Sequence, residues 1–357
     1  MSILIKRTNG RNSGVTSKNC PPNDVYNVKL ESNSTTVNIK WCDPDNSVIG
    51  GDTFATWSST ILVRKEGSAP KSPTDGTVVI TNIAKNKYKD TAISNTGLTA
   101  GKTYYYRFFV YGTNKLCNQS ESMIYSIKIY DSNSTTLSSL TWSDINEISE
   151  RGEASKYFKI GDSINIKTNS KYGSNVTVTA SIWDFNHFDK SDKSGKAGIV
   201  FGIDVNTNFY DRIWGEDDIA GYGEWVDSEL RVKNMPQIFA GLPGDLQSVI
   251  KNVDVYTSDS CYTYYNGYGS YDGYLTSEKV FIPGVVEIGF SDYKEAIPTQ
   301  NALEYFTDSF KRYSYGNVYW LRDIHQNHQW RTVNGTDKSL DFKDCYENAY
   351  IRFCFCV

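Results

Sequence analysis

The segment 313–357 constrains this chain more than any other stretch of the sequence. Two apolar blocks bound its interior, one at 318–321 and one at 350–357. Polar and aromatic residues fill the sequence between the blocks, with few aliphatic side chains. Apolar runs of this length are typical of buried strands, whereas Tyr, Trp, His, Asn and Asp are typical of protein contact surfaces. The segment therefore predicts a rigid apolar frame that holds an outward-facing binding surface.

We expect the frame to consist of Trp320, Leu321 and the strand Ile351–Phe355. The candidate contact residues lie between the two blocks or at their edges, and we expect their side chains to point away from the core. They are Tyr319, Asp323, His325, Asn327, His328, Trp330, Asn334, Asp344, Tyr346 and Asn348.

A second candidate surface is the Tyr-rich stretch 262–274, in which tyrosines alternate with Gly, Ser, Asn and Asp. So many phenol hydroxyls cannot all find partners in a small core. The rings therefore either stack on a ligand or pack against a neighbouring subunit, and the sequence leaves both alternatives open. The candidate residues are Tyr264, Tyr265, Tyr268 and Tyr271.

Composition excludes several classes of function. The net charge of −4 comes without a basic stripe, which argues against nucleic acid as a partner. No apolar run approaches the roughly 20 residues of a membrane span, so we expect no membrane insertion. The first residues lack the apolar core of a secretory signal, so we expect synthesis in a cytoplasm. The seven cysteines are odd in number and irregularly spaced, which favours buried thiols over a disulfide framework.

Changes in composition predict four parts of the chain. Residues 1–22 end in a Pro pair and read as an arm or attachment segment, and 23–130 contains short strands separated by turn residues. Residues 131–139 are a polar linker, and 140–357 form a second domain that mixes helices and strands. A length of 357 residues agrees with two or three domains.

Helix signals are concentrated in the second domain. Thr141 or Ser143 is suited to cap a helix that starts near Trp142, and Asp227–Ser228 precedes a helical pattern that reaches Phe239. Pro243 is tolerated in the first turn of the next short helix. A last short helix is expected over Asn301–Phe310.

The first domain resembles a fibronectin type III domain, in the version found in phage tail and baseplate proteins. The resemblance implies an all-β sandwich with Trp41 and Tyr106 in its core, usually serving as a spacer. It rests on a Trp that ends an early strand and on a Leu-Thr-x-Gly-x-x-Tyr-x-Tyr pattern with a later Tyr, namely Trp41, Leu98, Thr99, Gly101, Tyr104, Tyr106 and Tyr111.

The second domain resembles the C-type-lectin-like domain at the tips of phage tail fibres. The resemblance implies an α+β receptor-binding head without catalysis and without a cofactor. In some relatives a diversity-generating retroelement rewrites the segment between a Trp-Leu-Arg block and the last strand, which corresponds here to 313–350. The matching phrases are Trp142, Gly161–Asp162, Trp183–His187, Ser194–Ile199, Leu242–Lys251, Trp320–Arg322 and Phe353–Cys356.

Together the two resemblances imply a phage or prophage tail adhesin, located in the virion tail and not an enzyme. Its partners would be a host cell-surface receptor, either protein or glycan, and other tail or baseplate proteins held through the N-terminal arm. Fibre proteins of this kind are commonly homotrimers, and multivalency then strengthens weak single-site binding.

Two other functions stay open from the sequence. Glu216, Asp217 and Asp218 follow Trp214 and could supply the paired carboxylates of a glycan depolymerase. The chain could also be a purely structural tail component. We expect no metal site, because the Glu-Pro-Asn and Gln-Pro-Asp triplets of calcium lectins are absent. His325 and His328, three residues apart, are suited to metal binding only on a helix.

Overall fold

The chain forms two compact units, Met1–Ser134 and Thr135–Val357, and both are rich in β-strands. This division falls inside the polar stretch 131–139 that the sequence marks as a linker. The computed structural model describes residues 20–49, 52–131, 135–170, 173–204, 208–214, 225–258, 273–290, 301–312, 316–326 and 329–357. Most of the expected N-terminal arm therefore lies outside the described residues.

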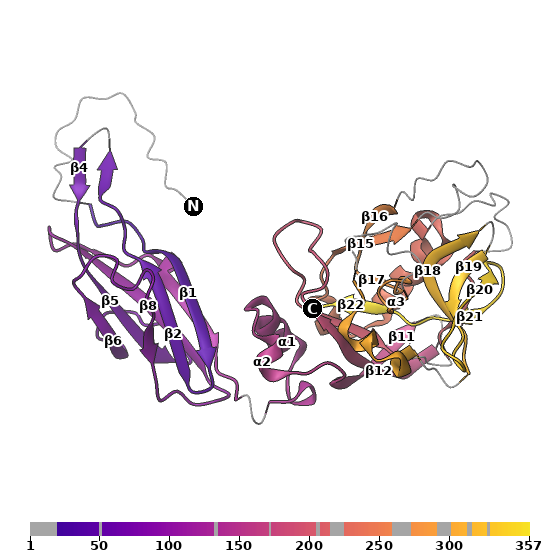
Figure 1. The fold of residues 1–357 in the computed structure, drawn as a ribbon. Helices are drawn as coiled ribbons and strands as arrows, with labels where there is room; N and C mark the ends of the chain where they lie inside the picture. The colour runs from indigo at the N-terminus through magenta and orange to yellow at the C-terminus, as the bar shows by residue number, and fades with distance from the viewer. Residues whose placement is uncertain are drawn as a thin grey trace. The chain divides into compact units, whose positions relative to one another are not determined.

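The strands of the first unit form two antiparallel sheets and a short hairpin (Figure 1). One sheet has the order β1-β2-β7, and the other has the order β10-β8-β5-β6 with β9 beside β8; β3 pairs with β4. The strands are β1 Tyr26–Asn33, β2 Thr36–Cys42, β3 Ser47–Ile49, β4 Asp52–Ala55, β5 Trp57–Glu66, β6 Thr77–Asn82, β7 Ile93–Asn95, β8 Thr103–Gly112, β9 Cys117–Asn118 and β10 Ile124–Lys128, with a 3-10 turn η1 at Glu121–Met123.

The core of the first unit lies between these two sheets. Every second residue of β2 from Val37 to Trp41 is buried, as the alternating pattern predicts. The Trp41 ring lies 4.7 Å from the Tyr88 ring and 5.1 Å from the ring of Phe108, which belongs to the opposite sheet. Tyr106 is fully buried in β8. The prediction that Trp41 and Tyr106 are core residues is thus confirmed.

A buried carboxylate at Asp43 fastens the loop after β2 to both sheets. Its Oδ1 accepts hydrogen bonds from Trp41 Nε1 at 2.9 Å and from Thr60 Oγ1 at 2.7 Å. Its Oδ2 accepts from Asn82 Nδ2 at 2.9 Å and from the backbone N–H of Asn86 at 2.8 Å. Because Asp43 is fully buried, each of these donors depends on this one side chain for its partner.

The second unit is built on a five-stranded antiparallel sheet with the order β11-β12-β13-β22-β17. Helix α1 packs on this sheet, with the Trp142 ring 5.5 Å from Phe201 and 6.3 Å from Phe355. Thr141 caps α1 through a reciprocal bond with Asp144, as predicted. The strands are β11 Ser163–Ser170, β12 Gly173–Phe185, β13 Ile199–Ile203, β17 Val280–Phe281 and β22 Cys354–Cys356, and the helices are α1 Trp142–Glu150, α2 Ala154–Tyr157, α3 Met235–Gly241 and α4 Gly244–Gln247.

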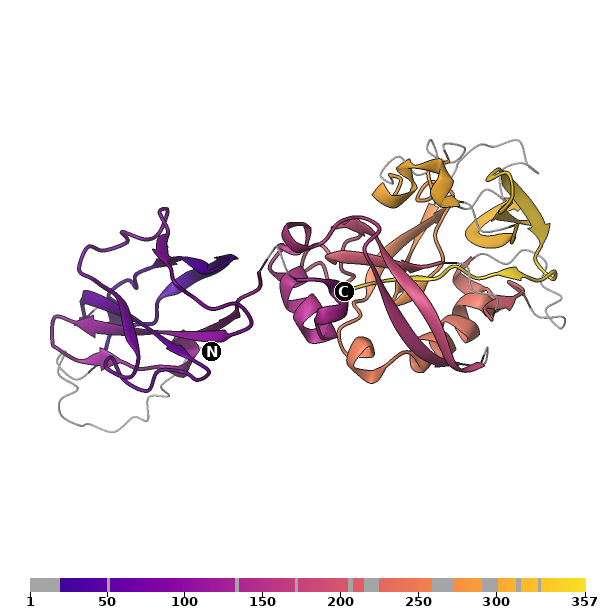
Figure 2. The ribbon, with the colours of Figure 1, turned by 90° about the horizontal axis from the view of Figure 1, so that it is seen from below.

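A second sheet and a hairpin complete this unit, as Figures 1 and 2 show. The sheet has the order β14-β21-β18-β19-β20, and β15 pairs with β16. The strands are β14 Tyr210–Asp211, β15 Val253–Ser258, β16 Gly273–Glu278, β18 Tyr319–Gln326, β19 Gln329–Val333, β20 Leu340–Asp344 and β21 Ala349–Tyr350; short helical turns are η2 Leu137–Ser139, η3 Trp225–Asp227, η4 Leu230–Asn234, η5 Glu304–Thr307 and η6 Ser309–Arg312.

The burial expected of the apolar frame is confirmed, but the expected strand Ile351–Phe355 is wrong in its bounds, because the strand β22 covers only Cys354–Cys356. Trp320 and Leu321 in β18 are fully buried, as are Ile351, Phe353 and Phe355. Strand β22 is not at an edge of its sheet, because it lies between β13 and β17. The end of the segment therefore belongs to the core of the unit.

The expected helix over Asn301–Phe310 is wrong in its start and in its type. Leu303 adopts an extended conformation, and its N–H donates to the backbone oxygen of Glu287 at 2.8 Å. Because Leu303 is extended, helical turns begin only at Glu304, and they are the 3-10 turns η5 and η6. The helix expected after Ser228 is present as a π-helical turn, η4, that leads into α3.

Replacing Asp43 with alanine tests the role of the buried carboxylate. We expect Asp43→Ala to lower the free energy of unfolding of the first unit by about 3 kcal/mol or more, because several buried donors lose their acceptor. Calorimetric or denaturant unfolding measures the change. Asp45→Ala is the matched control, since that side chain is 83% exposed, and we expect a change within about 0.5 kcal/mol. Equal effects of the two substitutions would contradict the assignment.

Candidate functional site

Three of the predicted contact residues face the core, so the expectation that they point outward is wrong. Tyr319, Asp323 and Trp330 are 0%, 2% and 1% exposed. The ring of Trp330 packs 6.5 Å from Trp225, and the ring of Tyr319 lies 5.2 Å from the guanidinium of Arg352. Burial also raises the pKa of the Tyr319 phenol. Large aromatic rings in a half-buried sheet go to the inner face, where they bury the most area.

The carboxylate of Asp323 is buried for a different reason. Its Oδ2 accepts a hydrogen bond from the backbone N–H of Val285 at 2.5 Å. The side chain thus ties β18 to the segment that follows β17, and it serves the frame instead of the surface.

The remaining predicted residues lie nearer to solvent, or outside the described part of the chain. His325, Asn334, Asp344 and Tyr346 are half-buried, and Asn348 is exposed. Asn327 and His328 lie outside the described residues, as do Tyr264, Tyr265, Tyr268 and Tyr271 and the acidic trio Glu216, Asp217 and Asp218.

Strands β18, β19 and β20 present one continuous outer face. Arg331 pairs with Phe342 and Gln329 pairs with Asp344 across β19 and β20, so these four side chains share one side of the sheet. The His325 ring stacks on Phe342, with ring centroids 4.5 Å apart and planes at 24°. We call these residues, His325, Gln329, Arg331, Phe342 and Asp344, the β18–β20 face.

This face combines an exposed aromatic ring with charges of both signs. Phe342 is 42% exposed although it is a large apolar residue. Arg331 lies directly opposite Phe342 on β19, and Asp344 follows Phe342 two residues later on β20. Partial burial, reinforced by the nearby Arg331, lowers the pKa of His325. Exposed rings beside arginine are typical of interaction hot spots.

Sequence reasoning missed Arg331 and Phe342, although a usable signal was present. Asn334–Gly335 is a common turn pair and marks a turn between two strands. The loop that joins β19 to β20 is longer than this pair alone predicts, since it spans 334–339 and Val333 pairs with Leu340. Side chains alternate along a strand, so assigning the large ring of Trp330 to the inner face places its neighbour Arg331 on the outer face. The prediction counted polar and aromatic residues without considering that side chains alternate along a strand. It therefore combined residues of the inner and the outer face of the sheet.

A buried ion pair fixes β18 behind the face. The guanidinium of Arg322 binds both carboxylate oxygens of Glu287, one of them at 2.7 Å, and both side chains are 0% exposed. Arg322 also donates from Nε to the backbone oxygen of Tyr256 and from Nη1 to that of Ile282, both at 2.9 Å. Burial alone lowers the pKa of Arg322, but the charge of Glu287 outweighs burial and the net pKa is raised.

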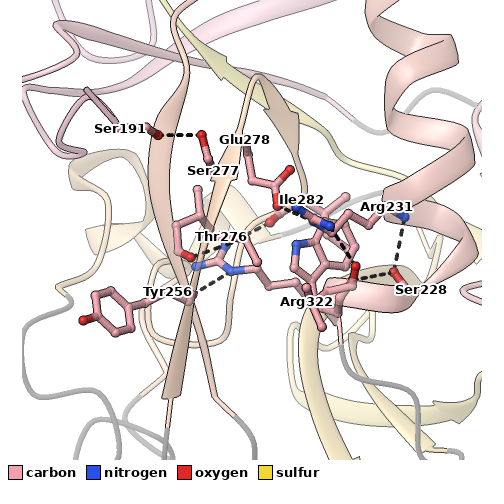
Figure 3. A network of polar contacts seen from close by, with 12 residues as sticks. Ser191, Ser228, Arg231, Tyr256, Thr276, Ser277, Glu278, Ile282 and Arg322 are labelled. Atoms are coloured by element: carbon pink, nitrogen blue, oxygen red, sulfur yellow. Dashed lines mark hydrogen bonds and ion pairs between the residues drawn. The ribbon is translucent and has the colours of Figure 1, made fainter. Parts of the chain in front are cut away.

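Figure 3 shows that this arginine joins β18 to the β15–β16 hairpin. On the neighbouring side of the hairpin, Arg231 Nε donates to Glu278 Oε1 at 2.5 Å, and its Nη1 donates to the Val226 oxygen at 2.7 Å. Ser277 and Ser191 bond at 2.7 Å and attach the hairpin to the loop after β12. The β15–β16 hairpin and the strand β18 therefore share one buried support.

The described residues offer little for covalent or metal chemistry. Within the described ranges, no group of three or more His, Cys, Asp or Glu side chains is arranged to hold a metal ion. Burial raises the pKa of Cys345 to about 12 and raises that of Cys354 well above its usual value, which is the opposite of an activated thiolate. His187 Nδ1 lies 2.9 Å from Asp184 Oδ2, and its ring packs 4.7 Å from Phe188.

We expect the His325 imidazole to titrate below its usual pKa of about 6.5, because its partly buried ring is harder to protonate. The charged form is disfavoured in the folded state, so His325 lowers stability as pH falls through about 6.5. NMR titration of the full chain measures the midpoint. Phe342→Ala exposes the ring and should move the midpoint up. A midpoint at or above the usual value in the unsubstituted chain would contradict this environment.

We expect Arg322→Met to destabilise the second unit by about 3–5 kcal/mol, because it leaves the Glu287 carboxylate buried without its partner. Adding Glu287→Gln removes the unpaired charge while keeping an acceptor for the N–H of Gly284, so the double variant should recover part of the loss. Denaturant unfolding of the single and double variants measures both steps. A single variant as stable as the parent chain would show that the pair is not the support described.

The comparisons with known proteins identify no family. No known family model and no curated protein matches the chain. Among the described residues, no helix is long and apolar enough to cross a membrane. Solved structures that match include titin kinase with its flanking domains (12% identity, 55% of this chain, 30% of that chain, TM-score 0.23) and the twitchin kinase region from C. elegans (13%, 51%, 31%, TM-score 0.22). The chain thus spans about a third of the length of these structures. Structural similarity at TM-scores this low indicates neither a shared fold nor a shared function.

Proposed function

We propose that this chain is a phage or prophage tail adhesin that binds a host cell-surface receptor through the β18–β20 face. The observation that carries the proposal is the contrast within one sheet. On the inner side of β18 and β19, the buried rings of Tyr319 and Trp330 and the ion pair between Arg322 and Glu287 fix the strands. On the outer side, Phe342 is exposed beside Arg331 and Asp344. A rigid support under an exposed mixed surface reduces the entropy cost of binding.

Two features of the fold support the resemblances on which the proposal also rests. In the first unit, the sheet orders β1-β2-β7 and β10-β8-β5-β6 agree with a fibronectin type III sandwich. In the second unit, a capped helix packs on a five-stranded sheet in which β22 lies between β13 and β17, and this arrangement supports a C-type-lectin-like head. The first unit would act as a spacer that presents the second.

The proposal includes the partners and the location that the resemblances imply. The receptor is a protein or a glycan on the host cell, and the protein is made in the bacterial cytoplasm and assembled into the virion tail as a homotrimer. If a retroelement diversifies 313–350, the tolerated changes would fall on the β18–β20 face, since substitutions at Tyr319, Asp323 and Trp330 would disturb buried contacts.

Cell binding by the full chain tests the proposal. We expect a fluorescently labelled chain to bind at least one strain in a panel of bacterial hosts. Arg331→Ala combined with Phe342→Ala should weaken that binding at least tenfold, because aromatic and arginine side chains at the centre of an interface commonly contribute about 2 kcal/mol each. Flow cytometry over a range of chain concentrations measures the affinity.

Ile83→Ala is the matched control, since Ile83 is a 78% exposed apolar residue of the first unit. We expect this variant to bind cells like the parent chain. Binding that survives the double substitution would place the receptor site elsewhere. Absence of binding to every strain would favour a structural role in the tail.

A further inference from the structure

A cavity of about 650 Å³ lies in the second unit, apart from the β18–β20 face. It is bounded by the loop after β12, by the β15–β16 hairpin and by the start of the segment at Asn301. None of the residues that define the β18–β20 face lines it. A volume of this size accommodates a small organic ligand.

One wall of the cavity is an exposed apolar patch on the hairpin. Tyr256 and Leu275 are directly opposite each other across β15 and β16, and they are 39% and 44% exposed. Their neighbours Val255 and Thr276 point to the buried side of the hairpin. Figure 3 shows the Tyr256 ring turned away from Arg322, while the backbone oxygen of Tyr256 accepts from that arginine. The bond from Arg322 thus fixes the backbone at Tyr256, and the Tyr256 ring lines the cavity.

The rest of the lining is largely polar, and its lysines are paired with carboxylates. Lys193 forms an ion pair with Asp254, and Lys196 forms one with Asp189 at 2.9 Å. Both lysines that line the cavity therefore already have a carboxylate partner. A phosphate-rich ligand would have to compete with these carboxylates, so the cavity is poorly suited to nucleic acid or another polyanion.

Two asparagine side chains add hydrogen-bond donors and acceptors to the lining of the cavity. The lining includes the amides of Asn186 and Asn301, each of which can donate and accept. The carboxylate of Asp184 lies beside them and is within 2.9 Å of the His187 ring. An apolar ligand would bury these groups without partners, which is costly.

We propose that this cavity binds one or two pyranose rings of a neutral glycan. A pyranose has a face of C–H groups that packs on an aromatic ring and a rim of hydroxyls that each donate and accept. The cavity offers this combination, with Tyr256 as the ring and Asn186, Asn301, Asp184 and Asp254 as the polar partners. The inference does not depend on the proposed role of the β18–β20 face, because the two sites share no residue.

The experiment uses the full chain and two kinds of probe. Saturation-transfer NMR with methyl glycosides of glucose, galactose, mannose and N-acetylglucosamine detects binding of single rings. An array of neutral and acidic oligosaccharides detects binding that requires a longer chain. We expect binding to at least one neutral probe and weaker or no binding to its acidic counterparts.

Three variants locate the binding. Tyr256→Ala should lower the affinity at least tenfold, whereas Tyr256→Phe keeps the ring and should stay within about threefold of the parent chain. Asn186→Gly should also lower the affinity several-fold. Asn186 has a φ of 57°, which glycine adopts without strain, so this substitution removes the amide while preserving the backbone. Unchanged melting temperatures would show that the variants remain folded.

Arg331→Ala is the control, and we expect it to leave saccharide binding unchanged. The inference is overturned if no neutral saccharide binds, if only acidic probes bind, or if Tyr256→Ala and Asn186→Gly bind like the parent chain. Loss of saccharide binding in the Tyr256 variant together with normal binding in the Arg331 and Phe342 variants would support it. These outcomes are independent of cell binding through the β18–β20 face, so either proposal can fail alone.

Discussion

The ion pair between Arg322 and Glu287 is the constraint on which the second unit depends. Both charges are fully buried, so each needs the other, and the planar guanidinium satisfies the carboxylate and two backbone oxygens at the same time. A lysine could not make this set of bonds, because it lacks the rigid fork of donors. The pair therefore fixes the position of β18 relative to the hairpin and to the segment after β17, and through them the outer surfaces that these elements carry.

A second buried arginine performs a related task between the two sheets. Arg352 donates to the backbone oxygens of Ile203 at 3.2 Å and of Lys311 at 3.1 Å. Its guanidinium lies 5.0 Å from the ring of Trp183 and 5.2 Å from that of Tyr319, which are contacts typical of cation–π interactions. Arg322 directly follows the first apolar block of the frame, and Arg352 lies near the start of the second, so each block has a buried arginine beside or within it.

The sequence predicted the frame better than the surface. Apolar blocks and strand alternation correctly placed Trp41 in one core and Trp320, Leu321 and Phe355 in the other, because burial of large apolar side chains dominates folding. The residues that point outward were harder to predict. A polar side chain such as Asp323 can be buried when a backbone N–H donates a hydrogen bond to it. The register of the β19–β20 hairpin decided which residues share a face, and composition does not contain register.

The position of β22 has a consequence for how the second unit is assembled during synthesis. Val200 in β13 pairs with Cys356, and Phe281 in β17 pairs with Cys354, so the sheet joins segments that are far apart in the sequence. Such non-local pairing is slow to form, because the intervening chain must be ordered first. Until β22 is in place, β13 and β17 each have an open edge that another chain can occupy. Nascent or truncated copies are therefore the forms most exposed to aggregation, and production of this protein should benefit from conditions that slow translation or supply chaperones.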